Sequence, residues 1–252
     1  MREFRSSFIG YPSTVQYMKF QEKSDSLLEY NQSLLAEGPN WEYATTNVDY
    51  YINSFGHRSK ELSDLNLNNY ILFTGCSFTE GVGVPVEKRY SDVLASMLGT
   101  DVYNLALSAS GNDILFYNLV SWFNTVKTKP KLVMIQWASD ARFMMLGKII
   151  RSVGPWNENY HDFLSSGDEI NYFHNKTELL KQMIRKIIDV PIIEVVWHPK
   201  KELPFDSKPQ YEIIIKPECV VDLARDRSHP GIKSNKIQAD LLFDYIKNVE
   251  LL

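Results

Sequence analysis

The sequence predicts an α/β fold in which a mainly parallel sheet carries helices on both faces. From Tyr70 onward, short apolar runs alternate with segments whose apolar residues recur at helical spacing. The apolar runs are nearly continuous rather than alternating, as expected for strands that are buried on both faces. The chain has 252 residues, of which 44% are hydrophobic and 13% aromatic, so it can form a large core.

The expected elements follow one another in a regular order. Strands are expected over Tyr70–Phe73, Val102–Leu107, Lys131–Trp137 and Val190–Trp197, with a fifth considered over Tyr211–Lys216. Helices are expected over Asp92–Leu98, Ile114–Val126, Thr177–Ile188 and Asn235–Val249. Gly99 is suited to end the first of these helices, and Thr177 to act as the N-cap of the third.

Residues 1–66 have a different character, and we interpret them as an N-terminal extension packed on a single main domain of residues 67–252. A polar helix is expected over Ser24–Leu35, with Ser24 or Asp25 as its N-cap. A short strand and turn over Asp49–Arg58 then leads into the domain. The extension is too short and too polar to form a core alone.

A long insertion is expected at about 144–176, between the third strand and the following helix. Connections of this length are unusual, so a lid or a substrate wall is predicted. The aromatic residues of the insertion could stack on sugar rings, although we expect more than half of them to pack within the protein. These residues are Trp156, Tyr160, Phe163, Tyr172 and Phe173.

Composition excludes several classes of function. The formal net charge of −4 gives no electrostatic footprint for nucleic acid. The two cysteines, Cys76 and Cys219, form neither a metal-ligand spacing nor a disulfide framework. No signal-peptide pattern and no apolar run of about 18 residues is present, so we expect a cytoplasmic or otherwise soluble protein that binds no membrane.

One serine and a distant Asp-x-x-His pair provide the groups needed for nucleophilic acyl transfer. Ser77 directly follows the first strand of the predicted sheet, and Asp226 and His229 stand three residues apart near the C-terminus. A serine hydroxyl is a weak nucleophile until a histidine accepts its proton, and that histidine requires an acceptor that fixes its tautomer. Sites in parallel sheets form at the carboxyl ends of the strands. The residues that follow predicted strand ends, and so are expected to converge on one edge, are Ser77, Ser108–Asn112, Trp137–Arg142 and His198.

Other motifs with a similar appearance are excluded. The serine turn is not a Gly-x-Ser-x-Gly elbow, because Thr79 occupies the position of the second glycine. It is not a phosphate-binding loop either, since no Gly-Lys-[Ser/Thr] follows it and Gly81-Val82-Gly83 lacks a third glycine at dinucleotide spacing. No cluster of potential ligands has metal spacing, so neither a metal nor a cofactor is expected.

The serine turn and the Asp-x-x-His segment resemble the first and last conserved motifs (blocks) of the SGNH (GDSL-type) hydrolase family. Gly75-Cys76-Ser77 stands where that family has Gly-Asp-Ser after its first strand, and Asp226-Arg227-Ser228-His229 matches its last block, Asp-x-x-His. The resemblance spans about Asn53 to Ile246. It implies a flavodoxin-like, three-layer α/β/α sandwich, with Ser77 as the nucleophile, His229 as the base and Asp226 orienting the histidine.

The sequence departs from the family in the second and third conserved motifs (blocks), which follow the second and third strands. In the family, these two blocks supply donors to the oxyanion hole. The glycine of the second block corresponds to Ala109 in the preferred alignment and to Gly111 in a shifted one. Ser139 replaces the asparagine of the third block, and Asn112 is a candidate substitute donor. The resemblance therefore implies an oxyanion hole made by the N–H groups of Ser77 and of Ala109 or Gly111, together with the side chain of Asn112 or Ser139. Loss of one such donor can lower a rate by about 10²–10³.

The predicted function is that of a serine esterase acting on a small acyl ester, with a small molecule or a glycan as the substrate. An acetyl group on a carbohydrate is favoured by family analogy and by the aromatic insertion. Two alternatives remain open: an acyltransferase that uses the same triad, and a catalytically weakened carbohydrate-binding or structural module. The missing third-block asparagine favours the second of these.

A few further residues are assigned at this stage. His57 and Arg58 are expected either to position a substrate carboxylate or to anchor the extension. Cys76 is expected to be a small packing residue beside the nucleophile. His198 follows the fourth strand, and a structural role is favoured for it over a catalytic one.

Overall fold

The structure is a computed structural model that describes residues 2–21, 24–145, 150–158, 160, 168–197 and 209–252. Its centre is a five-stranded sheet in which every pairing is parallel. From one edge to the other the strands are β11 (Tyr211–Ile214), β10 (Ile192–Val196), β7 (Leu132–Gln136), β5 (Tyr70–Thr74) and β6 (Asp101–Asn104). Read from the other edge, this is the strand order 2-1-3-4-5 of flavodoxin-like folds, as the resemblance implied.

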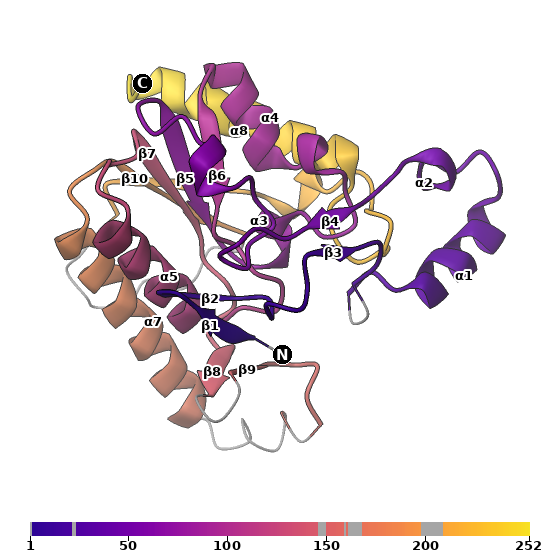
Figure 1. The fold of residues 1–252 in the computed structure, drawn as a ribbon, viewed down its shortest axis with the longest axis horizontal. Coiled ribbons are helices and arrows are strands. Elements are labelled where there is room, and N and C mark those ends of the chain that lie inside the picture. Colours follow the sequence, from indigo (N-terminus) through magenta and orange to yellow (C-terminus); the bar gives the residue numbers. More distant parts are fainter. Residues whose placement is uncertain (1, 22–23, 146–149, 159, 161–167, 198–208) are drawn as a thin grey trace.

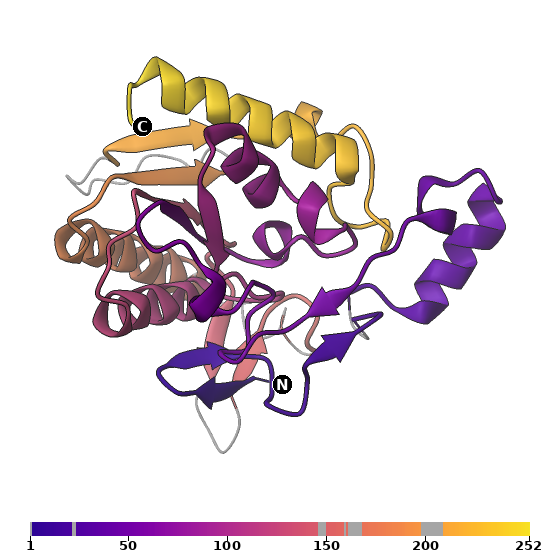
Figure 2. The same ribbon diagram turned by 45° about the horizontal axis from the view of Figure 1, so that its top comes forward.

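Helices cover both faces of this sheet and complete the three-layer sandwich (Figures 1 and 2). One face carries α4 (Tyr90–Leu98) and α8 (Ile232–Asn248), and the other carries α5 (Asn112–Thr125) and α7 (Asp168–Ile187). Successive side chains of a strand point to opposite faces, so β5 contributes to two separate apolar clusters. Leu72 packs in the cluster that contains Trp122 of α5, whereas Ile71 and Phe73 pack in the cluster that contains Leu242 of α8.

The sequence-based elements are confirmed in order and kind, with corrections at several ends. Gly99 ends α4 in the left-handed conformation, as expected. The third predicted helix begins at Asp168, well before its predicted start, so Thr177 is not an N-cap. Thr177 is buried within α7, where its hydroxyl accepts a hydrogen bond from Asn112 at 3.1 Å. The last helix also begins early, at Ile232, with Gly231 as its N-cap.

The first 66 residues form two small antiparallel pairs and a helical arm. The pairs are β1 (Glu3–Arg5) with β2 (Phe8–Gly10) and β3 (Tyr17–Met18) with β4 (Tyr50–Tyr51). The arm consists of α1 (Leu27–Glu37) and α2 (Glu42–Thr45), which project to one side of the molecule (Figure 1).

The start of α1 corrects another prediction. Its N-cap is Ser26, which forms a capping box with Glu29, and not Ser24 or Asp25. Asp25 is instead completely buried. The residue expected to cap a helix therefore has a different role, described below.

The extension packs directly on the sandwich. Phe8 is completely buried in the cluster beneath α5, where its ring lies 6.3 Å from that of Trp122. The side-chain amide of Asn118 on α5 binds both the N–H and the carbonyl of Ile9 at 2.8 Å. These contacts make the extension part of the main apolar cluster.

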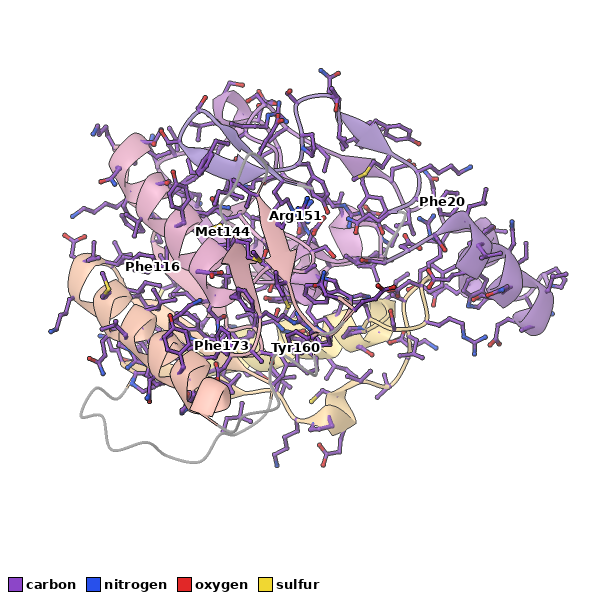
Figure 3. The ribbon with its side chains drawn as sticks, turned by 90° about the horizontal axis from the view of Figure 1, so that it is seen from below. Phe20, Phe116, Met144, Arg151, Tyr160 and Phe173 are labelled. Atoms are coloured by element: carbon purple, nitrogen blue, oxygen red, sulfur yellow. The ribbon has the colours of Figure 1, made fainter. Side chains whose placement is uncertain are left out.

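The region of the predicted insertion contains a short hairpin, β8 (Phe143–Met145) with β9 (Arg151–Val153), which Figure 3 marks with Met144 and Arg151. Phe143 stacks on Phe173 at 5.0 Å. Tyr160 and Phe173 are buried packing residues, whereas Trp156 and Tyr172 are exposed. Phe163 lies outside the described residues.

Short 3₁₀ turns complete the fold at η1 (Leu62–Asp64), η2 (Val86–Lys88) and η3 (Pro217–Cys219). In the described ranges of the chain, no helix has the length and apolar character required to cross a membrane.

Candidate active site

The predicted nucleophile lies in a tight turn at the carboxyl end of β5. Ser77 is the first residue of α3 (Ser77–Glu80), a single helical turn. Gly75 is required here, because a Cβ atom at this position would lie 2.2 Å from Oγ1 of Thr79. The carbonyl of Ser77 accepts hydrogen bonds from the N–H groups of Gly81 and Val82, at 3.0 and 3.1 Å. These contacts fix the backbone of the serine turn.

The predicted acid and base are hydrogen bonded to each other. Nδ1 of His229 binds Oδ2 of Asp226, whose side chain is fully buried while that of His229 remains 13% exposed. The other carboxylate oxygen accepts from the backbone N–H groups of Ser228 and His229, at 3.3 and 3.2 Å. Since a carboxylate can only accept, Nδ1 of His229 carries the proton and Nε2 is left as the proton acceptor.

The serine turn and the base loop, residues 224–230, lie side by side. The ring of Phe78, directly after Ser77, packs edge-on against the imidazole of His229 with their centroids 5.3 Å apart. The N–H of Arg225, directly before Asp226, donates to the carbonyl of Gly83 at 3.0 Å. Among the described residues no hydrogen bond joins Ser77 Oγ to His229, and such bonds often form only when a substrate is bound.

The loop of residues 105–111, which holds the candidates for the family's second block, lies next to the serine turn. The N–H of Leu107 in this loop donates to the carbonyl of Gly75 at 3.4 Å. Ala109 in this loop has a φ of +60°, the left-handed conformation that glycine adopts most readily. This is the position at which the preferred alignment places the family's glycine. Within the described ranges, the backbone N–H groups of Ser77, Ala109 and Gly111 have no hydrogen-bond partner.

Gly111 has a separate structural reason to be glycine. It is the N-cap of α5, and a Cβ atom there would lie 2.6 Å from the carbonyl oxygen of Arg142. Close backbone packing therefore accounts for this residue without a catalytic role.

The two candidate side-chain donors of the oxyanion hole have opposite surroundings. Asn112 is buried, and its Oδ1 accepts from the N–H of Ala138 at 2.9 Å. Its two amide hydrogens bind the carbonyl of Ala138 and the hydroxyl of Thr177, both at 3.1 Å. To stabilise an oxyanion, Asn112 would have to give up one of these bonds. Ser139 is exposed, with its hydroxyl uncommitted in the part of the chain that the structure describes.

His57 and Arg58 anchor the extension. His57 is completely buried, its Nδ1 lies 3.2 Å from the hydroxyl of Tyr103, and burial lowers its pKa to about 3. Arg58 is buried and donates to the carbonyls of Asp49, Gly81 and Val84, at 2.7, 2.6 and 2.9 Å. Neither residue is positioned to bind a substrate.

Other assignments are resolved more simply. Cys76 is a buried free thiol and Cys219 is also free. His198 lies outside the described residues. The described part of the chain contains no group of three or more histidine, cysteine, aspartate or glutamate residues that could hold a metal ion.

Sequence reasoning missed the residues that support the site from behind. Glu80, in the turn after Ser77, is completely buried and accepts hydrogen bonds from Tyr11 and Gln21 of the extension and from the N–H of Ser108. On the other side, Asp25 pairs with Arg225 of the base loop. The sequence carries no local signal for these contacts, because the partners lie far apart along the chain.

Comparisons with known proteins find similarity among solved structures. No family model and no curated protein matches the chain. A family two carbohydrate esterase from Clostridium thermocellum is 16% identical with a TM-score of 0.46, and a GDSL-like lipase from Bacteroides thetaiotaomicron is 15% identical with a TM-score of 0.43. The esterase EstA from a Pseudoalteromonas species is 12% identical, with a TM-score of 0.44.

The matched regions cover 73%, 72% and 72% of this chain and 65%, 89% and 98% of the three proteins, respectively. The match thus spans only about two thirds of the length of the carbohydrate esterase. At this level of similarity, the assignment of a function depends on the geometry of the site.

Proposed function

We propose that this protein is a serine esterase that hydrolyses small acyl esters through Ser77, His229 and Asp226. The observation that carries the proposal is the contact between the serine turn and the base loop. The Asp226–His229 pair is buried at its aspartate end, and its imidazole packs against the residue that follows Ser77. Because Asp226 binds Nδ1, we assign Nε2 of His229 as the acceptor for the proton of the Ser77 hydroxyl.

The reaction would follow the two steps of nucleophilic catalysis. Ser77 Oγ attacks the ester carbonyl while His229 takes its proton, and the resulting imidazolium is stabilised by Asp226. The protonated histidine then gives this proton to the departing alcohol, which leaves an acyl-enzyme. A water molecule, deprotonated by His229, attacks the acyl-enzyme carbonyl. The bond to Ser77 Oγ breaks, His229 returns the proton to this oxygen, and the acid is released.

For the oxyanion hole, the backbone geometry favours the N–H groups of Ser77 and Ala109. Both groups are free within the described residues, and Ala109 has a φ of +60°, in the left-handed region that glycine adopts most readily. Gly111 remains the donor in the shifted alignment. The Ser139 hydroxyl is the favoured third donor, because the amide of Asn112 is committed to Ala138 and Thr177.

The proposed substrate is an acyl, and in particular an acetyl, ester of a carbohydrate. The exposed residue Trp156 supports it. This residue is 44% exposed, and its ring centroid lies 5.3 Å from the guanidinium carbon of Arg142. Exposed aromatic rings of this kind can stack on sugar rings. If a sugar hydroxyl replaced water in the second step, the same triad would catalyse acyl transfer, and analysis of products with and without an acceptor would separate the two.

A second candidate function is a catalytically weakened carbohydrate-binding module. It is favoured by a specific observation, which is that the third-block position holds the exposed Ser139 in place of an asparagine. Binding of a glycan without any hydrolysis of its esters would support this alternative.

The proposal is tested by hydrolysis of 4-nitrophenyl acetate. Ser77→Ala and His229→Ala are each expected to lower kcat/KM by about 10³ or more, because each removes a member of the triad. Ser96→Ala, which changes an exposed serine on α4, is the matched control and should keep the full rate. Wild-type rates in both triad variants would overturn the proposal.

A further inference from the structure

A buried ion pair connects the N-terminal extension to the base loop. The guanidinium of Arg225 binds Asp25 through two nitrogens, with Nε 3.0 Å from Oδ1 and Nη2 2.6 Å from Oδ2. The side chains of Arg225 and Asp25 are only 3% and 1% exposed. The ring of Phe20 lies 4.4 Å from the guanidinium. Arg225 directly precedes the triad aspartate, so the extension holds this loop next to its catalytic residue.

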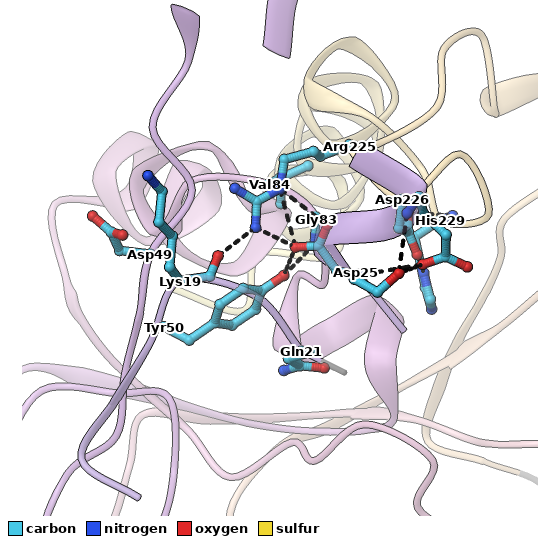
Figure 4. Close-up of polar contacts among 12 residues, drawn as sticks. Lys19, Gln21, Asp25, Asp49, Tyr50, Gly83, Val84, Arg225, Asp226 and His229 are labelled. Carbon is cyan, nitrogen blue, oxygen red and sulfur yellow. Dashed lines mark hydrogen bonds and ion pairs between the residues drawn. The ribbon is translucent and has the colours of Figure 1, made fainter. Parts of the chain in front are cut away.

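The ion pair is part of a closed ring of hydrogen bonds (Figure 4). The hydroxyl of Tyr50 donates to Asp25 and accepts from the N–H of Gly83 at 2.8 Å. The carbonyl of Gly83 in turn accepts from the N–H of Arg225 at 3.0 Å. Asp25, Arg225, Gly83 and Tyr50 therefore hold one another in place.

Gly83 brings this ring into contact with the triad. A Cβ atom at Gly83 would lie 3.1 Å from Oδ1 of Asp226, so its backbone packs directly against the carboxylate. Gly83 is also close to the serine turn along the chain. The two residues before it, Gly81 and Val82, donate their N–H groups to the carbonyl of Ser77. The ring thus connects the serine turn with the base loop.

Asp25 also neutralises the positive charge of Arg225 near the triad. Without Asp25, Arg225 would be a buried cation without its partner, one residue from the carboxylate that orients His229. Removing one partner of a buried ion pair is far more disruptive than removing both, because an uncompensated charge remains. An unpaired Arg225 would compete with His229 for Asp226.

We propose that Asp25 is a positioning residue for the Asp226–His229 pair and that it acts through Arg225. It neutralises the guanidinium and holds the backbone of residues 224–226 against Gly83. This keeps Oδ2 of Asp226 in place for His229 and for the Ser228 hydroxyl, which donates to the same oxygen at 2.6 Å. This proposal rests on the proposed function of the triad.

The kinetic test is the Asp25→Asn variant, which removes the charge and keeps the shape. We expect kcat for 4-nitrophenyl acetate to fall by about 10- to 100-fold with KM nearly unchanged, because the base is affected and substrate binding is not. Adding Arg225→Gln should raise kcat severalfold above that of Asp25→Asn, since neighbouring residues couple strongly and the double variant leaves no unpaired charge.

The matched control is Glu37→Gln. Glu37 also joins the extension to the base loop, through Arg227 at 3.0 Å, but these side chains are 43% and 47% exposed. An exposed pair contributes little, so kcat should change by less than about twofold.

A spectroscopic readout separates this proposal from the proposed function. The proton on Nδ1 of His229, hydrogen bonded to a carboxylate, should give a downfield ¹H NMR signal that disappears in His229→Gln. We expect this signal to persist in Glu37→Gln, to shift or vanish in Asp25→Asn, and to return in the double variant. If the wild-type protein hydrolysed no ester, the proposed function would fail, and the NMR signal would still test the positioning role.

Tyr50→Phe tests the ring without leaving an unpaired charge, in case Asp25→Asn does not fold. It removes the hydroxyl that joins Asp25 to Gly83 and with it two hydrogen bonds. We therefore expect kcat to fall by about 3- to 10-fold and the NMR signal to shift. The decisive variant is Asp25→Asn if it folds, and Tyr50→Phe if only that one folds. The proposal would be overturned if this variant kept both the wild-type kcat and the wild-type NMR signal. A double variant no better than Asp25→Asn would also overturn it.

Discussion

The base side and the oxyanion side of the candidate site are built in different ways. The base side consists of side chains, with Asp226 buried and bonded to His229 and with Arg225 held by Asp25 behind it. The oxyanion side consists mainly of backbone N–H groups in two turns, with an exposed serine where the family has an asparagine. In the proposed site, the groups assigned to proton transfer are therefore specified by residue type, whereas the groups assigned to the oxyanion depend on backbone conformation.

The largest expected effect comes from breaking the base side at Asp226→Asn. An amide can donate its own hydrogen to Nδ1 and so stabilises the wrong tautomer of His229, which lowers kcat by about 10³–10⁴ in comparable triads. Steady-state kinetics at saturating substrate, with circular dichroism to confirm folding, provides the measurement. Asp240→Asn, which breaks an exposed pair with Lys236, is the control. A variant at Asp226 that kept the full rate would show that the pair is structural.

The Ser139→Asn variant tests whether position 139 supplies a donor to the oxyanion hole. It introduces the asparagine that the family has in its third block. Because one donor to an oxyanion is worth about 10²–10³ in rate, we expect kcat to rise by about 10-fold or more if the longer side chain reaches the same position. Ser139→Ala should lower kcat by no more than about 10-fold. If neither variant changed kcat, position 139 would have no part in the oxyanion hole.

A smaller effect is expected from Ala109→Gly, which tests the backbone itself. At a φ of +60° a non-glycine residue is strained by about 1–2 kcal/mol, so glycine should raise the free energy of unfolding by about 1 kcal/mol. The N–H remains in place, and kcat should stay within about twofold. Denaturant unfolding measures the change, with Ala44→Gly in α2 as a control that should destabilise. Destabilisation by Ala109→Gly would argue against a left-handed turn here.

The last prediction concerns the pH dependence of stability and His57, which anchors the extension that supports the base side. Burial lowers its pKa from 6.5 to about 3 in the folded protein. Between these values the unfolded chain binds a proton that the folded chain does not, so this contribution to stability is lost as the pH falls from 6.5 toward 3. In His57→Gln, the proton uptake on unfolding near pH 5 should decrease by about one. Unfolding free energies at pH 7 and pH 5 give this value, and an unchanged pH dependence would contradict a buried neutral histidine.

The sandwich and the base side could be predicted from sequence for a common reason. Continuous apolar runs such as Ile71–Phe73 mark buried strands, and parallel strands bring their carboxyl ends to one edge. The strand pattern placed Ser77 at this edge, and the chemistry of an Asp-x-x-His pair, together with the family resemblance, indicated its partners Asp226 and His229. The local pattern was sufficient because each element carries its own signal.

The remaining features depend on contacts that a local pattern does not contain. Asp25 was expected to cap a helix, but its partner Arg225 lies 200 residues away. Asn112 is a candidate oxyanion donor, and the sequence did not indicate that its amide also joins α5 to the end of β7 and to α7. The left-handed conformation of Ala109 could not be predicted, because alanine, unlike glycine, rarely adopts a positive φ. These residues depend on tertiary packing, which sequence spacing does not encode.

Labelling with a fluorophosphonate probe, mapped by mass spectrometry, tests most directly whether Ser77 is an activated nucleophile. We predict a single adduct on Ser77 that forms much more slowly in His229→Gln and Asp226→Asn and at the normal rate in Glu37→Gln. An adduct on another residue, or labelling of Ser77 at the same rate without His229, would contradict the proposed triad.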